Sequence, residues 1–134
     1  MGLKSIKFGN TSDLHLRHPV SDAPLYNDDG TPMIITLAGE HSEDYKAVTR
    51  RWQNDMLRRP NRKLNADQVE ERSLDLLVAV TKGWAIQWEE GQMLPFSPQA
   101  ARELYADREH AWIKQQVEQH VYEASNFLGE SLRA

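Results

Sequence analysis

Histidines are the residues of this chain with the most versatile chemistry, because an imidazole can bind a metal or transfer a proton near neutral pH. The five are His15, His18, His41, His110 and His120. His15 and His18 form an H-x-x-H pair, but residues three apart on a strand point to opposite faces. The His110 and His120 pair also lacks the i, i+4 spacing of a zinc-binding helix. The spacing therefore predicts no metal site.

Nucleophilic and acid–base chemistry is equally hard to assemble from this sequence. The absence of cysteine removes disulfides, thiolate nucleophiles and cysteine-bound metals. There is no G-x-S-x-G motif, and the seven glycines are too dispersed for a phosphate-binding loop. Glu89 and Glu90 are adjacent acids beside a turn glycine, a pattern typical of a solvated loop. We therefore expect no enzyme activity, no catalytic residues and no cofactor.

Charge is concentrated in one segment. The net charge is −4, yet residues 46–63 carry many cations against Asp55 alone. The cations are Lys46, Arg50, Arg51, Arg58, Arg59, Arg62 and Lys63. The favoured interpretation is a solvated helix face that pairs with acids of the next helix, namely Glu70, Glu71 and Asp75. A site for an acidic protein partner ranks second. Nucleic acid ranks last, because an acidic chain repels phosphate and no aromatic platform accompanies the arginines.

Aromatic side chains are the other candidates for a binding role, since tryptophan and arginine are enriched at interface hot spots. Trp52 and Trp112 lie on apolar stripes and are expected in the core. Trp84 and Trp88 flank a short acidic loop, and we expect them to close the core between the second and third helices. Phe96 belongs to the same corner. The predicted partner-binding residues are Arg50, Arg51, Arg58, Arg59, Arg62, Trp84, Trp88 and Phe96.

The first part of the chain predicts a small β element. Residues 1–12 show little periodicity and are expected to form a flexible arm. Residues 13–20 alternate weakly, as a strand does. A turn cluster over residues 27–30 separates Leu25-Tyr26 from a β-branched run over residues 33–37, so a β-hairpin is expected.

Helix signals dominate from residue 42 onward. Ser42 is an expected N-cap, and Pro60 should stop that helix near Arg59. Its apolar stripe is Tyr45, Val48, Trp52 and Met56. The second helix opens with a capping box from Asn65 to Gln68. Its expected buried face is Val69, Ser73, Leu76, Leu77 and Val80.

The remaining helices follow an extended segment. The second helix is expected to end at Thr81-Lys82-Gly83, with Gly83 at the C′ position. Alternation over residues 84–88 indicates an extended segment, and residues 89–92 a turn. Ser97 with Pro98 marks a third helix. A fourth begins after Asp107 and is expected to end near Phe127-Leu128, with Gly129 behind.

These signals predict a mainly α fold with about four helices and a small N-terminal β-hairpin, or α+β if the hairpin is counted. We expect one domain over residues 1–134, with a β element over 13–40 and a helical part over 42–129. The longest strongly apolar run, LDLLVAV, is too short to cross a bilayer. The N-terminal residues lack the apolar core of a signal peptide. The expected location is the cytoplasm, without a membrane partner.

Several segments resemble the tail assembly chaperones of long-tailed bacteriophages or prophages. They are LLVAVTKGW, a short acidic turn with glycine, LPFSPQAARELY, IKQQVEQHV and NFLG. The segment GTPMIITLAGEHSEDYKA is similar to N-terminal stretches of such proteins, so the likeness spans roughly residues 25–129. Two positions depart from the pattern, Gln99 and His120, where an asparagine and an aromatic residue are expected.

The resemblance implies a non-catalytic helper that binds the tape measure protein, keeps it soluble and recruits tail tube subunits. It implies self-association into a homo-oligomer, a place in the bacterial host cytoplasm and absence from the mature virion. The physical logic is that an unassembled tape measure exposes long apolar helical stripes that aggregate. Two alternatives stay open: a small nucleic-acid-binding phage regulator that uses the basic helix, and a virion connector protein.

Overall fold

The centre of the fold is a three-stranded antiparallel sheet in a computed structural model that describes residues 2–128. Its strands are β1 (Thr11–His15), β2 (Ile34–Ala38) and β3 (Thr81–Ala85), in the order β1-β2-β3. Thr11 faces Ala38 in the first pair, and Thr36 faces Gly83 in the second. The central strand buries Ile35 and Leu37 completely, because alternate residues of a strand share a face.

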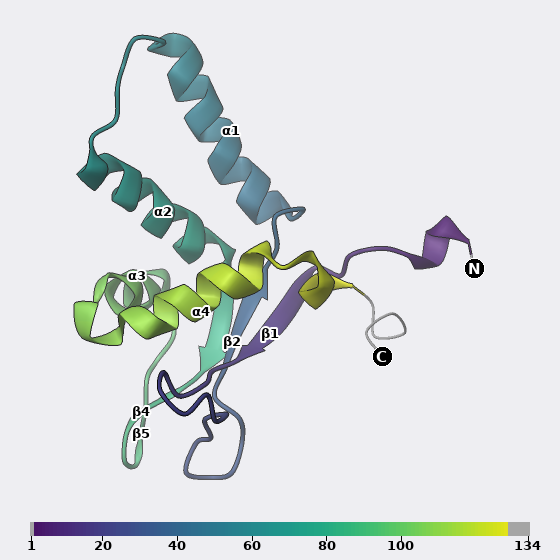
Figure 1. The fold of residues 1–134 in the computed structure, drawn as a ribbon, viewed down its shortest axis with the longest axis vertical. Helices are drawn as coiled ribbons and strands as arrows, with labels where there is room; N and C mark the ends of the chain where they lie inside the picture. Colours follow the sequence, from purple (N-terminus) through teal and green to yellow (C-terminus); the bar gives the residue numbers. More distant parts are fainter. Residues whose placement is uncertain (1, 129–134) are drawn as a thin grey trace.

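A long helical hairpin extends from one end of this sheet (Figure 1). It consists of α1 (Glu43–Arg58) and α2 (Ala66–Val80). The Ser42 hydroxyl accepts from the Tyr45 N–H at 3.2 Å and starts α1. The Asn65 capping box starts α2, with the Gln68 N–H donating to the Asn65 side chain at 2.9 Å. Both helix starts and the end of α1 at Arg58 confirm the sequence expectations.

The rest of the chain covers the sheet and forms a corner beside it. β4 (Gln87–Glu89) and β5 (Gln92–Met93) form a small hairpin, followed by α3 (Pro98–Ala106). A 3-10 turn, η2 (Arg108–His110), leads into α4 (Ala111–Tyr122), which crosses the sheet (Figure 1). Short 3-10 turns η1 (Leu3–Ser5) and η3 (Ala124–Phe127) lie near the two ends.

The hydrophobic core lies between the sheet, α4, α3 and the second half of α2. From α4 it receives Ile113, Val117 and Val121. From α2 it receives Leu74, Leu77 and Val80. α1 contributes little, since Val48 is its one buried residue. The proximal part of the helical hairpin is thus held by the core, whereas its distal part projects away from it.

The expected fold class is correct in outline. The described residues contain four α-helices; helical residues, α and 3-10 together, dominate at 49%, and residues in strands and isolated bridges make up 20%. The predicted turn is present: Tyr26 bridges Pro32, and Gly30 has a φ of +88°. None of the helices in residues 2–128 has the length and apolarity needed to cross a membrane.

Several boundaries need correction. The predicted arm over residues 1–12 ends early, because Thr11 and Ser12 belong to β1. The helical part over residues 42–129 contains β3, β4 and β5. Gly83 is not a helix C′ residue: α2 passes directly into β3, where Gly83 pairs with Thr36.

The fourth helix also differs from the expectation. α4 ends at Tyr122, and the segment up to Phe127 is a separate 3-10 turn. The expected glycine stop, Gly129, lies outside the described residues.

Candidate partner-binding surfaces

The predicted basic residues all lie on the helical hairpin. Arg50, Arg51 and Arg58 are on α1, Arg59 is its C-cap and Arg62 follows in the loop to α2. All five are exposed.

The acidic residues of α2 do not neutralise these cations, which corrects the sequence expectation. Arg102 of α3 donates to Asp75 at 2.7 Å and also bonds Glu71. Arg50 pairs within its own helix with Glu43 at 2.9 Å, and Arg62 reaches Asp55 at 3.4 Å. Within residues 2–128, no ion pair involves Arg51, Arg58, Arg59 or Lys63.

Exposed apolar side chains accompany these cations at the distal end of the hairpin. Met56 and Leu57, at the end of α1, are 61% and 79% exposed, and Val69 in the first turns of α2 is 55% exposed. The sequence stripe placed Met56 and Val69 in the core. Both are solvent-facing because only the other helix of the hairpin lies near these turns (Figure 1). We call Met56, Leu57, Val69, Arg58, Arg59, Arg62 and Lys63 the hairpin tip.

A shallow pocket of about 370 Å³ lies between α1, α2 and α3, nearer the core than the hairpin tip. Its apolar lining is Trp52, Val78 and Ala79. Arg51, Asp75 and Arg102 supply the polar lining. Trp52 is half-buried, and the Arg72 guanidinium lies 5.5 Å from its ring centroid. The pocket offers an apolar floor with cations at its edge.

The aromatic corner of the sequence divides into a structural and an exposed part. Trp84 packs against the core, donates from Nε1 to the Leu94 carbonyl at 2.9 Å and meets Phe96 edge-on at 5.0 Å. Trp112 also packs against the core. Trp88 does not close the core as expected: it is 47% exposed, and its ring lies 4.9 Å from His110. Trp88 lies on β4, outside the three-stranded sheet, where it lines a pocket with residues of α3 instead of entering the core.

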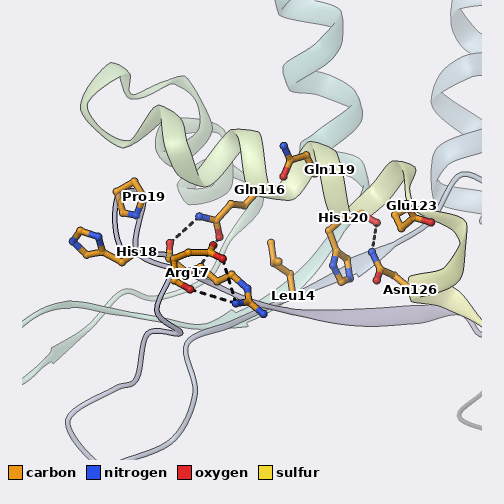
Figure 2. Close-up of a pocket in the computed structure, with 10 residues that line it drawn as sticks. Leu14, Arg17, His18, Pro19, Gln116, Gln119, His120, Glu123 and Asn126 are labelled. Carbon is orange, nitrogen blue, oxygen red and sulfur yellow. Dashed lines mark hydrogen bonds and ion pairs between the residues drawn. The ribbon is translucent and has the colours of Figure 1, made fainter. Parts of the chain in front are cut away.

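A larger pocket, of about 450 Å³, lies between β1, the loop after it and α4 (Figure 2). Gln116 joins its two sides, because its amide accepts from the Arg17 N–H at 2.9 Å and donates to the Arg17 carbonyl at 2.8 Å. His18 shapes the loop: its Nδ1 accepts from the N–H groups of Val20 and Ser21. Sequence reasoning missed this pocket, since it depends on a contact between segments 99 residues apart.

The histidines near this pocket serve as hydrogen-bonding groups. His120 Nε2 lies 2.9 Å from the Ser12 hydroxyl. The Asn126 amide donates to the His120 carbonyl at 3.1 Å (Figure 2). Across residues 2–128, no group of three or more histidine and acidic side chains is placed to hold a metal ion. No model of a known protein family, no curated protein and no solved structure matches the chain.

Proposed function

We propose that this chain is a tail assembly chaperone of a long-tailed phage or prophage, a non-catalytic protein that binds the tape measure protein. The sequence segments quoted above support the family. The observation that carries the proposal is the hairpin tip, where exposed apolar side chains and exposed cations occur together at the end of α1, in the loop and at the start of α2. Exposed apolar surface with a polar rim is typical of protein interaction sites.

The hairpin tip suits the chemistry of an unassembled tape measure. A long apolar helical stripe aggregates unless another surface covers it, and helix-in-groove contacts are the usual way to cover it. Burial of each of the partly exposed side chains Met56, Leu57 and Val69 contributes about 1–2 kcal/mol. The pocket floored by Trp52 continues the binding surface toward the core.

The cations at the tip add selectivity. Arg58, Arg59 and Lys63 of the tip, and Arg51 at the edge of the Trp52 pocket, make no ion pair with the described residues, so their charge is available to acids on a partner helix. Complementary charge speeds association and discriminates against basic partners. In this proposal the protein also recruits tail tube subunits, acts in the host cytoplasm as a homo-oligomer and leaves before the virion matures.

The test is co-expression of a tagged chain with its neighbouring genes, followed by affinity capture and mass spectrometry. The expected result is recovery of a long, helix-rich protein in the soluble fraction. The double variant Met56→Asp/Leu57→Asp should reduce that recovery by about tenfold or more. Val20→Asp is the matched control, because Val20 is 89% exposed on a loop away from the hairpin. Loss of recovery in both variants, or none in either, would contradict a role for the tip.

The exposed arginines also favour a second candidate, a nucleic-acid-binding regulator. Capture of DNA alone, with affinity for generic duplex that falls steeply as salt rises, would replace the chaperone proposal with this one. Detection of the protein in purified particles would instead support a virion connector.

A further inference from the structure

The N-terminal arm, residues 2–8, is apolar and basic and lies away from the body of the protein (Figure 1). Leu3, Ile6 and Phe8 are 86%, 47% and 45% exposed. Lys4 and Lys7 alternate with them, and this segment contains no acid. Residues 2–6 of the arm are held by local hydrogen bonds, such as the one from the Ile6 N–H to the Leu3 carbonyl at 3.0 Å. It therefore presents apolar surface that the other residues in the described range 2–128 do not cover.

Contacts of Phe8 and Gly9 anchor the end of the arm nearest β1, so the fold sets the direction in which the arm extends. The Gly9 N–H donates to the Phe127 carbonyl at 2.6 Å, and His41 Nε2 lies 2.8 Å from the Gly9 carbonyl. The Phe8 ring stacks on His41 with centroids 4.7 Å apart. Residues 2–7 extend outward from this anchor, and six residues span up to ~20 Å when extended.

An apolar surface that carries acidic instead of basic side chains lies beside α3. A pocket of about 220 Å³ is lined by Trp88, Leu94, Ala100, Glu103, Leu104 and Asp107. We call it the corner pocket. Trp88 is half-exposed above it, and Met93 of β5 is 50% exposed on the adjoining hairpin. The pocket is thus apolar on its floor and has room for an aliphatic side chain.

The rim of the corner pocket is acidic. Glu103 and Asp107 line it, and Glu89 and Glu90 sit at the tip of the β4–β5 hairpin. A hydrogen bond with His110 at 2.7 Å lowers the pKa of the Asp107 carboxyl, which is therefore charged at neutral pH. Arg108 is exposed next to Asp107 in the chain, but the carboxylates outnumber it.

The arm and the corner pocket are complementary in both polarity and charge. The arm nevertheless extends from the opposite side of the molecule to α3, which lines the pocket (Figure 1). The arm is anchored near β1 and η3 and reaches ~20 Å, which is too short to pass around the body of its own molecule to α3. We propose that the arm of one copy binds the corner pocket of a second copy, with Leu3 or Ile6 in the pocket and the lysines facing its carboxylates. Each copy has one arm and one pocket, so the contact is head-to-tail and leaves both ends able to bind again.

This inference is separate from binding at the hairpin tip and is tested by self-association alone. Sedimentation of the purified full chain over a concentration series should show reversible association. Leu3→Asp/Ile6→Asp should weaken that association by about tenfold or more, and Val20→Asp should leave it unchanged. All of these sites are exposed, so the variants are expected to fold, which circular dichroism checks.

Charge-reversal variants test the contact between the arm and the corner pocket most directly. Lys4→Glu/Lys7→Glu and Glu90→Lys/Glu103→Lys should each be monomeric alone, because like charges meet at the contact. Their mixture should associate, since each reversed arm then meets a reversed pocket and each normal arm a normal pocket. A wild type that stays monomeric at its highest soluble concentration would overturn the inference, as would association that the arm variants leave intact. Capture of a tape-measure-like protein would remain a separate outcome, so the two failures are distinguishable.

Discussion

The junction between α2 and β3 depends on a buried pair of hydroxyl groups, and its removal is a sharp test of the fold. Thr81 Oγ1 donates to the Leu77 carbonyl at 2.6 Å and lies 2.8 Å from the Tyr105 hydroxyl. Thr81 has one hydroxyl proton and gives it to Leu77, so Tyr105 is the donor in the second bond. Tyr105 is 2% exposed and Thr81 is 6% exposed, so water replaces neither partner.

The two single substitutions should differ in cost. Tyr105→Phe removes one donor and leaves Thr81 bonded to Leu77, at a cost of about 1 kcal/mol. Thr81→Val removes both bonds and leaves the Tyr105 hydroxyl buried without an acceptor, at a cost of about 2–3 kcal/mol. The double variant should cost less than the sum by about 1 kcal/mol, because no unpaired hydroxyl remains.

Urea unfolding of the four proteins measures these free energies directly. Each 1 kcal/mol should lower Tm by about 4 °C for a chain of this size. Additive single costs, or a larger loss for Tyr105→Phe than for Thr81→Val, would refute the assignment of Tyr105 as the donor and the buried pair as a unit.

The buried Tyr105 hydroxyl also predicts how the free energy of unfolding depends on pH. Burial raises the pKa of Tyr105 to about 12 from its usual value of 10.0. The folded state then holds the proton more tightly than the unfolded state, so this contribution is complete below about pH 10 and is lost as pH rises toward 12. The loss amounts to about 3 kcal/mol. The pKa of Tyr122 is also raised by burial, so the measurement is the difference between wild type and Tyr105→Phe across this window.

Three further predictions concern single sites. Asn65→Ala removes the capping box of α2 and should lower the unfolding free energy by about 1 kcal/mol, whereas Asn65→Ser should retain most of it, as urea titration will show. Arg102→Gln breaks the link to two carboxylates of α2 and should cost about 1 kcal/mol, with a loss that shrinks as salt rises in thermal melts. Gly91→Ala should destabilise by about 1 kcal/mol because Gly91 has a φ of +74°, whereas Gly83→Ala should be neutral or slightly stabilising, since its Cβ meets nothing within 4 Å; equal effects by calorimetry would contradict this.

Helix and turn starts were predictable because each depends on residues within four positions of one another. Ser42 caps α1, and Asn65 with Gln68 closes its own capping box. Ser97 caps α3 through the Ala100 N–H at 2.9 Å, with Pro98 in its first turn. Gly91 supplies the positive φ of the β4–β5 turn. In each case the side chain satisfies a nearby backbone group, so the local sequence contains the whole interaction.

The third strand was only half predictable. Alternation from Trp84 onward indicated an extended segment, but its pairing with β2 joins Gly83 to Thr36 across the chain. A glycine directly after an apolar helix, such as Gly83, is also typical of a helix C′ position. The tertiary context overrode that local signal, because an antiparallel partner for β2 satisfies more backbone groups than a left-handed turn.

The sequence by itself determined where the first three helices begin, the dominance of helix and the presence of a basic segment on α1 and the loop after it. The expected start of the fourth helix after Asp107 was wrong, because Asp107 caps η2 and α4 begins at Ala111. Only the tertiary structure decided which faces are covered. Met56 lies on an apolar stripe but is exposed because α1 projects beyond the core, and Trp88 is half-exposed because it lines a pocket beside α3 rather than entering the core. The Glu71 and Asp75 carboxylates of α2 pair with Arg102 of α3 rather than with the cations of α1. Burial and ion pairing depend on residues distant in the chain, and local periodicity contains no information about which distant element packs against a given face.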